Sequence, residues 1–193
     1  MKRRSKCHKC LNPILENLMS NELPELISEQ PTKIQIPKRG QESVWSYPRP
    51  PRLVRVHQQM RVEFGGLVLA ETTQGYRVLE TASPPVYYFP PVDVRIAYLM
   101  LSSKQTECKW KGVARYWSLR VEKRTAIEAA WSYAHPREEY EGICDYFAFY
   151  SGNVDACYVG KQKVKPQPGD YYGGWITSKI LGPFKGEPGT EFW

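Results

Sequence analysis

The chain has 193 residues, of which 41% are hydrophobic and 24% charged, so it is long enough for one ordinary domain with an appendage and too apolar to be disordered throughout. No uncharged apolar stretch approaches the roughly 20 residues that a membrane-spanning helix needs, so we expect no membrane association. The formal net charge of +7 is spread along the chain without a basic helix or a recognised binding motif, which argues against a nucleic-acid partner.

Residues 1–40 are predicted to form an extension of a globular domain at residues 41–193. All 6 Trp, 13 Tyr and 6 Phe lie after residue 42, and large rings supply much of the buried area of a core. Apolar residues of the extension recur at spacings of three, four and seven, which predicts an amphipathic helix or, because of Pro24, two short helices. The polar side is acidic, which disfavours a membrane surface, so residues 11–30 are a candidate for docking on a protein partner or on the domain itself.

Five cysteines at irregular spacing favour reduced thiols, and therefore a cytoplasmic protein, over a secreted disulfide framework. Cys7 and Cys10 have the spacing of half a zinc site or of a redox pair. No second such pair follows, so we predict no metal site. Two ordinary thiols, or translation beginning at Met19, are the alternatives for this segment.

From residue 53 onward the local pattern predicts mainly strands. Gly65-Gly66 lies between two apolar-rich segments and predicts a tight hairpin over residues 61–70, because two-residue turns require a positive φ. Residues 76–80 are the next predicted strand. Residues 86–89 lie between two Pro-Pro pairs and suit only a short or edge strand.

The second half of the domain alternates predicted strands with short helices. Asp93 is expected to cap a short helix that reaches about Met100. The clearest long strand is 112–122, with residues 125–133 as its hairpin partner. One face of the long strand is predicted to carry Val113, Arg115, Trp117, Leu119 and Val121.

The remaining segments complete a mainly β domain. Residues 136–146 are predicted to be helical, and residues 147–150 and 154–159 to be closing strands. The Gly- and aromatic-rich tail from 171 to 186 is expected to fold over the body as ordered loops. The predicted fold class is therefore a single compact antiparallel β domain with one or two short helices, plus the N-terminal helical extension.

Several motifs in one fixed order carry a resemblance to a known family. They include Glu42-Ser43-Val44-Trp45-Ser46-Tyr47-Pro48-Arg49-Pro50-Pro51, Arg77-Val78-Leu79-Glu80-Thr81, Pro84-Pro85-Val86-Tyr87-Tyr88, Cys108-Lys109-Trp110-Lys111-Gly112, Ala114-Arg115-Tyr116-Trp117, Ala130-Trp131-Ser132-Tyr133 and Ala148-Phe149-Tyr150. Over residues 41–193 the chain resembles the family catalogued as domain of unknown function 427, and its tail resembles members of cyanobacterial type.

The resemblance implies a small, soluble, largely β domain of the kind found in bacteria and fungi. A nucleotidyltransferase label is attached to this family, but we expect no such activity. The chain has no Gly-Ser pair followed by spaced carboxylates and no phosphate-cradling loop. The family's histidine before Pro-Pro is replaced here by Ser83, and His57 and His135 are expected to be exposed.

Polar residues embedded among aromatics in these motifs predict a pocket with aromatic walls and a few convergent polar groups. The candidate ligand-binding residues are Arg77, Glu80, Cys108, Lys111, Tyr116, Trp117 and Tyr133. The alternative is a structural role, with a buried thiol, an ion pair of Glu80 and tyrosines packed in the core.

The leading functional prediction is a domain that binds a small molecule, and neither the residues nor the resemblance identifies a cofactor. One alternative is a small enzyme with Glu80 as general acid or base and Cys108 or Lys111 as nucleophile, since a nearby ammonium favours the thiolate. A second alternative is an interaction subunit that docks through residues 11–30.

Overall fold

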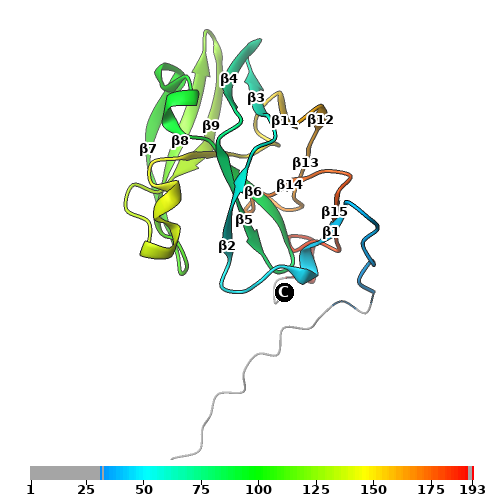
Figure 1. The fold of residues 1–193 in the computed structure, drawn as a ribbon. Helices are drawn as coiled ribbons and strands as arrows, with labels where there is room; N and C mark the ends of the chain where they lie inside the picture. The colour runs from blue at the N-terminus through cyan, green and yellow to red at the C-terminus, as the bar shows by residue number, and fades with distance from the viewer. Residues whose placement is uncertain (1–30, 32, 191–192) are drawn as a thin grey trace, which may run out of the picture.

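The computed structural model describes residues 31, 33–190 and 193. The predicted helix and the Cys7–Cys10 pair of the N-terminal extension lie outside these residues. Nearly all regular structure in the described part is β-strand, as predicted, and its helical segments are four short 3₁₀ helices (Figure 1).

One antiparallel sheet has the strand order β12-β11-β3-β4. Its strands are β3 (Met60–Phe64), β4 (Leu67–Thr72), β11 (Ala156–Val159) and β12 (Gln162–Lys163). The predicted hairpin joins β3 to β4, and Gly65 and Gly66 have φ angles of +62° and +78°. A side chain at Gly65 would also collide with Val121, because an added Cβ would lie 2.7 Å from the Val121 Cβ.

A second antiparallel sheet has the order β10-β9-β8-β7. Its strands are β7 (Leu99–Cys108), β8 (Gly112–Val121), β9 (Arg124–Ser132) and β10 (Phe147–Phe149). The predicted pairing of β8 with β9 is confirmed. Strand β7 was not expected, because it is an edge strand whose residues are mostly exposed and therefore carry little apolar alternation.

A three-stranded sheet, of order β2-β5-β6, continues the second sheet. It contains β2 (Arg52–Val56), β5 (Gly75–Glu80) and β6 (Ser83–Tyr88). Strand β6 is at the edge, which accommodates Pro84-Pro85 and agrees with the prediction. Just after β6, Phe89 and Phe147 exchange backbone hydrogen bonds of 2.8 and 2.9 Å, so the end of β6 lies beside the start of β10 and the two sheets are joined there.

Two details of the predicted fold are wrong. The helical segments η1 (Val44–Ser46), η2 (Pro91–Asp93), η3 (Ile96–Tyr98) and η4 (Glu138–Ile143) are all short 3₁₀ turns, and η4 lies within the helix predicted over residues 136–146. Asp93 ends η2 instead of capping a helix, and Met100 pairs with Ser118 in the sheet, so its backbone is extended. The fold is also not wholly antiparallel, because β1 (Glu42–Ser43) runs parallel to β15 (Ile180–Leu181).

The predicted face of the long strand β8 is buried over only part of its length. Its pairing with β9 shifts register between Trp117 and Leu119, which marks a bulge. Before the bulge Val113 and Arg115 are exposed, whereas Leu119 and Val121 beyond it are buried. The extra residues lie in β9, since two residues of β8 stand opposite four of β9, so the alternation along β8 continues and Trp117, Leu119 and Val121 all pack in the main core.

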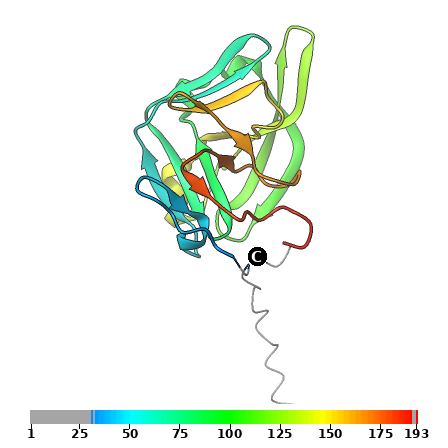
Figure 2. The ribbon, with the colours of Figure 1, turned by 90° about the vertical axis from the view of Figure 1, so that its right-hand side faces the viewer.

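The C-terminal tail crosses the body of the domain, as the orange and red segment of Figure 2 shows. It contains the short pair β13 (Lys165–Pro166) and β14 (Trp175–Ile176). Trp175 is fully buried, and its indole N–H donates to the Phe149 carbonyl at 2.9 Å. The Trp175 ring also packs against Tyr87, with 5.1 Å between centroids, so this residue anchors the tail to the core.

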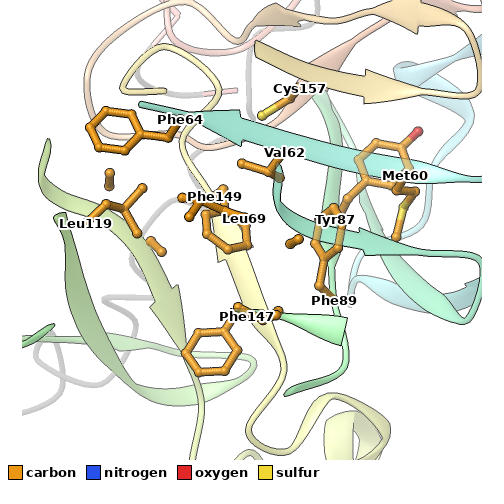
Figure 3. Close-up of a cluster of buried hydrophobic side chains, with 14 of the residues drawn as sticks. Met60, Val62, Phe64, Leu69, Tyr87, Phe89, Leu119, Phe147, Phe149 and Cys157 are labelled. Carbon is orange, nitrogen blue, oxygen red and sulfur yellow. The ribbon is translucent and has the colours of Figure 1, made fainter. Parts of the chain in front are cut away.

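The main core lies between the sheet of β3, β4 and β11 and the sheet of β8, β9 and β10. Figure 3 shows Val62, Phe64 and Leu69 from the first sheet facing Phe147 and Phe149 from the second. All five side chains are almost completely buried. Burial of these apolar surfaces is the main favourable contribution to the stability of the fold.

Asp155 joins two hairpins at the surface. Its two carboxylate oxygens accept hydrogen bonds from both terminal nitrogens of Arg124, at 2.7 and 2.8 Å. The backbone N–H of Gly65 also donates to Asp155, at 2.8 Å. The start of β9 is thereby tied to the turn between β3 and β4. The pKa of Asp155 lies below its ordinary value, chiefly because of the Arg124 hydrogen bonds.

We predict that Trp175→Ala lowers the free energy of unfolding by about 3–5 kcal/mol, because it leaves a cavity and an unpaired Phe149 carbonyl. Chemical denaturation measures the change. Val92→Ala is the control, since Val92 is 88% exposed and its truncation should change stability by less than about 0.5 kcal/mol. A loss for Trp175→Ala no larger than that of the control would show that Trp175 does not anchor the tail.

We predict that Asp155→Asn reduces the loss of stability in acid. A carboxyl whose pKa is lower in the folded protein stabilises the fold above its unfolded value of about 3.9, and this contribution disappears as the pH falls through the folded pKa. The measurement is the difference between urea midpoints at neutral pH and at about pH 3. The difference should be smaller for the variant than for the wild type. An identical acid dependence in the two proteins would contradict this role.

Candidate functional site

A second aromatic cluster, on the face of the sheets opposite the main core, surrounds a cavity of about 180 Å³. Strands β5, β6, β7, β8 and β9 contribute lining residues, and the C-terminal tail closes one side. The lining includes Val86, Tyr88, Thr106, Glu107, Trp131, Tyr150, Gln167, Tyr171, Tyr172, Gly173 and Lys185 in addition to five of the predicted residues. Tyr171 is 68% exposed and Glu107 is exposed, so the cavity opens to solvent on their side.

The two-residue alternation of strands explains why these side chains meet. Tyr116 on β8 is paired directly with Trp131 on β9, and both side chains face the cavity. Tyr133 lies two residues after Trp131 and therefore faces the same way. Ala114 and Ala148 are buried in this cluster, and their small side chains leave space among the rings.

Five of the seven predicted site residues line the cavity: Glu80, Cys108, Lys111, Tyr116 and Tyr133. Trp117 does not, because it alternates with Tyr116 and faces the main core. Its ring lies 5.4 Å from that of Phe147, and its indole N–H donates to Ser132 at 3.0 Å.

Arg77 is also directed away from the cavity. Its guanidinium makes two hydrogen bonds to Glu42, of 3.0 and 3.1 Å, and the same carboxylate accepts the hydroxyl of Tyr47 at 2.8 Å. Arg77 therefore connects β5 to β1. Burial and the neighbouring Glu42 raise the pKa of Tyr47 above its ordinary range, so this phenol stays a donor.

Lys111 is the most unusual residue of the site. It lies in the turn between β7 and β8, where its carbonyl accepts a hydrogen bond from the Arg137 backbone N–H at 3.2 Å. The residue is only 8% exposed. Its ammonium nitrogen lies 5.9 Å from the ring centroid of Tyr133 and 6.0 Å from that of Tyr140. Among the described residues it has no acidic partner and no hydrogen-bond acceptor.

Charged residues around the cavity are otherwise compensated. Glu80 lies 3.8 Å from Arg49, and Glu107 lies 4.0 Å from Arg137 at the exposed rim. The ammonium of Lys185 donates to the Trp193 carbonyl. Burial, together with the nearby charge of Arg49, lowers the pKa of Lys185. Lys111 is thus a cation of the lining for which the described residues supply no carboxylate, and its ammonium contacts only the rings of Tyr133 and Tyr140.

The tyrosines of the lining are neutral donors. Burial raises the pKa of Tyr88, Tyr133 and Tyr150 well above the ordinary value, and it raises that of the neighbouring Tyr140 to about 12. The Tyr150 hydroxyl donates to the Tyr171 carbonyl at 3.3 Å and so contacts the tail. Phenols in this environment offer hydrogen bonds without carrying charge.

Glu80, Cys108 and Lys111 line one cavity, as the enzymatic alternative requires, but their catalytic roles stay a prediction. His57 and His135 are exposed, as expected. In the part of the chain that the structure describes, no three His, Cys, Asp or Glu side chains are grouped to hold a metal ion. No helix in the same residues is long and apolar enough to span a membrane.

Sequence reasoning missed part of the lining. Tyr88, Trp131 and Tyr150 lie inside the quoted motifs, and the alternation from Tyr116 and Tyr133 identifies them once the strands are paired. Gln167 and the tail residues had no such signal, because only the tertiary fold brings them to the cavity. Gln167 holds the tail in place by donating to the Lys185 carbonyl at 2.7 Å and accepting from the Gly174 N–H at 3.1 Å.

A family profile described as domain of unknown function (DUF427) matches residues 52–160, which is more than half of the chain. The chain belongs to the DUF427 family. The matched region includes all five strands that line the cavity, and it also includes Lys111 and Tyr150. The tail that closes the DUF427 cavity lies outside the match, so its likeness to cyanobacterial members stays a prediction. No curated protein matches the chain.

We predict that Lys111→Met raises the free energy of unfolding by about 1 kcal/mol, because it replaces an ammonium that has no acidic partner in the described protein by an apolar side chain among aromatic rings. Urea denaturation without added ligand measures the change. Lys109→Met is the matched control, since Lys109 is exposed two residues away and stacks on Trp110 at 4.5 Å. A loss of stability for Lys111→Met alone would show that Lys111 serves the fold instead of a ligand.

Proposed function

We propose that this DUF427 domain binds a small organic molecule in the cavity between the β5–β9 strands and the C-terminal tail. The observation that supports the proposal is the largely buried Lys111, whose ammonium lines an aromatic cavity and has no acidic partner among the described residues. Buried charges in proteins are normally paired, because desolvation of an isolated ion is costly. A ligand that supplies the missing partner explains why such a group is kept here.

The walls of the cavity suit a flat, largely apolar ligand. The rings of Trp131 and Tyr150 lie 4.6 Å apart, and those of Tyr88 and Trp131 lie 6.4 Å apart. Aromatic walls with a few fixed polar groups are typical of sites for small molecules. The volume of about 180 Å³ is close to that of an engineered cavity of about 150 Å³ that holds benzene, so one ring with a small substituent fits.

The tail makes the site more than a surface hollow. Tyr171, Tyr172 and Gly173 cover the cavity opposite the strands, and Trp175 fixes the end of this segment in the core. An added Cβ on Gly173 would lie 2.2 Å from the Trp131 ring, so the tail backbone packs directly against the aromatic wall. A ligand in the cavity would therefore contact both the family domain and the tail.

Val86→Phe tests the proposal by placing a ring in the cavity from β6, where Val86 is half-buried. Ligand-observed NMR with a set of monocyclic aromatic compounds should detect binding to the wild type, and the variant should bind the hits at least about tenfold more weakly. Val113→Phe makes the same change on the outer face of β8, where Val113 is 47% exposed, and should bind like the wild type. Equal binding by both variants would place the ligand elsewhere.

A further inference from the structure

We propose that the ligand of this cavity is a monoanion with one aromatic ring, whose carboxylate pairs with the Lys111 ammonium while its ring lies among the surrounding aromatic side chains. This inference rests on the proposed function and names the class of ligand. It follows from three properties of the lining: its uncompensated charge, the protonation of its phenols and the small number of its free cationic groups.

The uncompensated charge of the lining is positive. Glu80 and Glu107 each have an arginine within 4.0 Å, and among the described residues neither carboxylate forms an ion pair with Lys111. Lys185 adds a second cation whose ammonium already contacts a backbone carbonyl. An anionic ligand would be attracted by this positive charge, whereas a cationic ligand would be repelled by Lys111 despite the aromatic walls.

The phenols cannot serve as the counter-ion. Burial raises the pKa of Tyr88, Tyr133 and Tyr150, which keeps these hydroxyls protonated at neutral pH. They therefore leave the positive charge of Lys111 uncompensated. Protonated phenols can instead donate hydrogen bonds to an anion, and such charge-assisted bonds are stronger than those between neutral groups.

The small number of free cationic groups around the cavity favours a carboxylate over a phosphate as the anionic group of the ligand. Phosphate sites usually combine several cations or bidentate arginines with a cradle of backbone N–H groups. The arginines near this cavity, Arg49 and Arg137, face the carboxylates of Glu80 and Glu107. One free ammonium matches a single negative charge, and a cavity of about 180 Å³ accommodates a ring of benzoate size.

The test compares benzoate with its neutral analogue benzamide by NMR titration of the full chain. We expect wild type to bind benzoate at least about tenfold more tightly than benzamide. Lys111→Met should bind the two probes equally and keep the wild-type affinity for benzamide. Lys109→Met, which removes a charge outside the cavity, should keep the preference for benzoate. Lys111→Gln serves as a second variant if the Met variant does not fold.

The outcomes separate the inference from the proposed function. Equal affinity of the wild type for benzoate and benzamide overturns the carboxylate assignment and leaves a neutral ligand. A benzoate preference that survives in Lys111→Met also overturns it, because another cation then supplies the charge. Tighter binding of phenyl phosphate than of benzoate assigns the site to a phosphate ester. Binding of none of the three probes overturns both the inference and the proposed function for ligands of this size.

Discussion

The alternation of side chains along the strands is the constraint on which the rest of the structure depends. Strands β6, β8, β9 and β10 send successive residues to opposite faces, and both faces are buried. One face builds the main core with residues such as Phe89 and Phe149, and the other builds the aromatic cluster around the cavity. Tyr87 and Tyr88 illustrate the division, since the first contacts Trp175 in the core and the second contacts Trp131 at the cavity.

The two faces have different chemistry. The main core is filled with aliphatic and aromatic side chains that need no partner beyond good packing. The cavity face carries phenols, a thiol and an ammonium among its rings, and two alanines leave space between them. Stability alone does not require such groups there, because an apolar side chain in place of Lys111 would cost less to bury. The phenols, the thiol and the ammonium lie together on one face of a sheet that is buried on both faces, and this identifies the candidate site.

Local sequence patterns were enough to predict several elements of the fold and several residues of the cavity. Gly65-Gly66 identified the first hairpin because only a positive φ suits that turn, and the Pro pairs identified β6 as an edge strand. Glu80, Cys108 and Lys111 were found because polar residues among aromatics are unusual at strand ends. Trp117 was misplaced for a reason equally local, since adjacent residues of a strand face opposite sides and its neighbour Tyr116 occupies the cavity face.

The rest depended on long-range contacts that no local pattern records. The tail reaches the cavity because Trp175 is buried in the core, where its indole N–H donates to the carbonyl of Phe149, a residue 26 positions earlier in the chain. Strand β7 exists because it pairs with β8, not because its own residues alternate. The lack of an acidic partner for Lys111 is likewise a property of the tertiary structure. Glu80 and Glu107 line the same cavity, but each lies within 4.0 Å of an arginine instead of pairing with Lys111.

The most direct test of this account is the side-chain NMR signal of Lys111 itself, assigned by its disappearance in Lys111→Met. The account predicts that the Lys111 ammonium resonance shifts when a small aromatic carboxylate is added, while that of Lys109 stays in place. A Lys111 resonance that does not change at saturating ligand would contradict the claim that this ammonium is the binding group of the cavity.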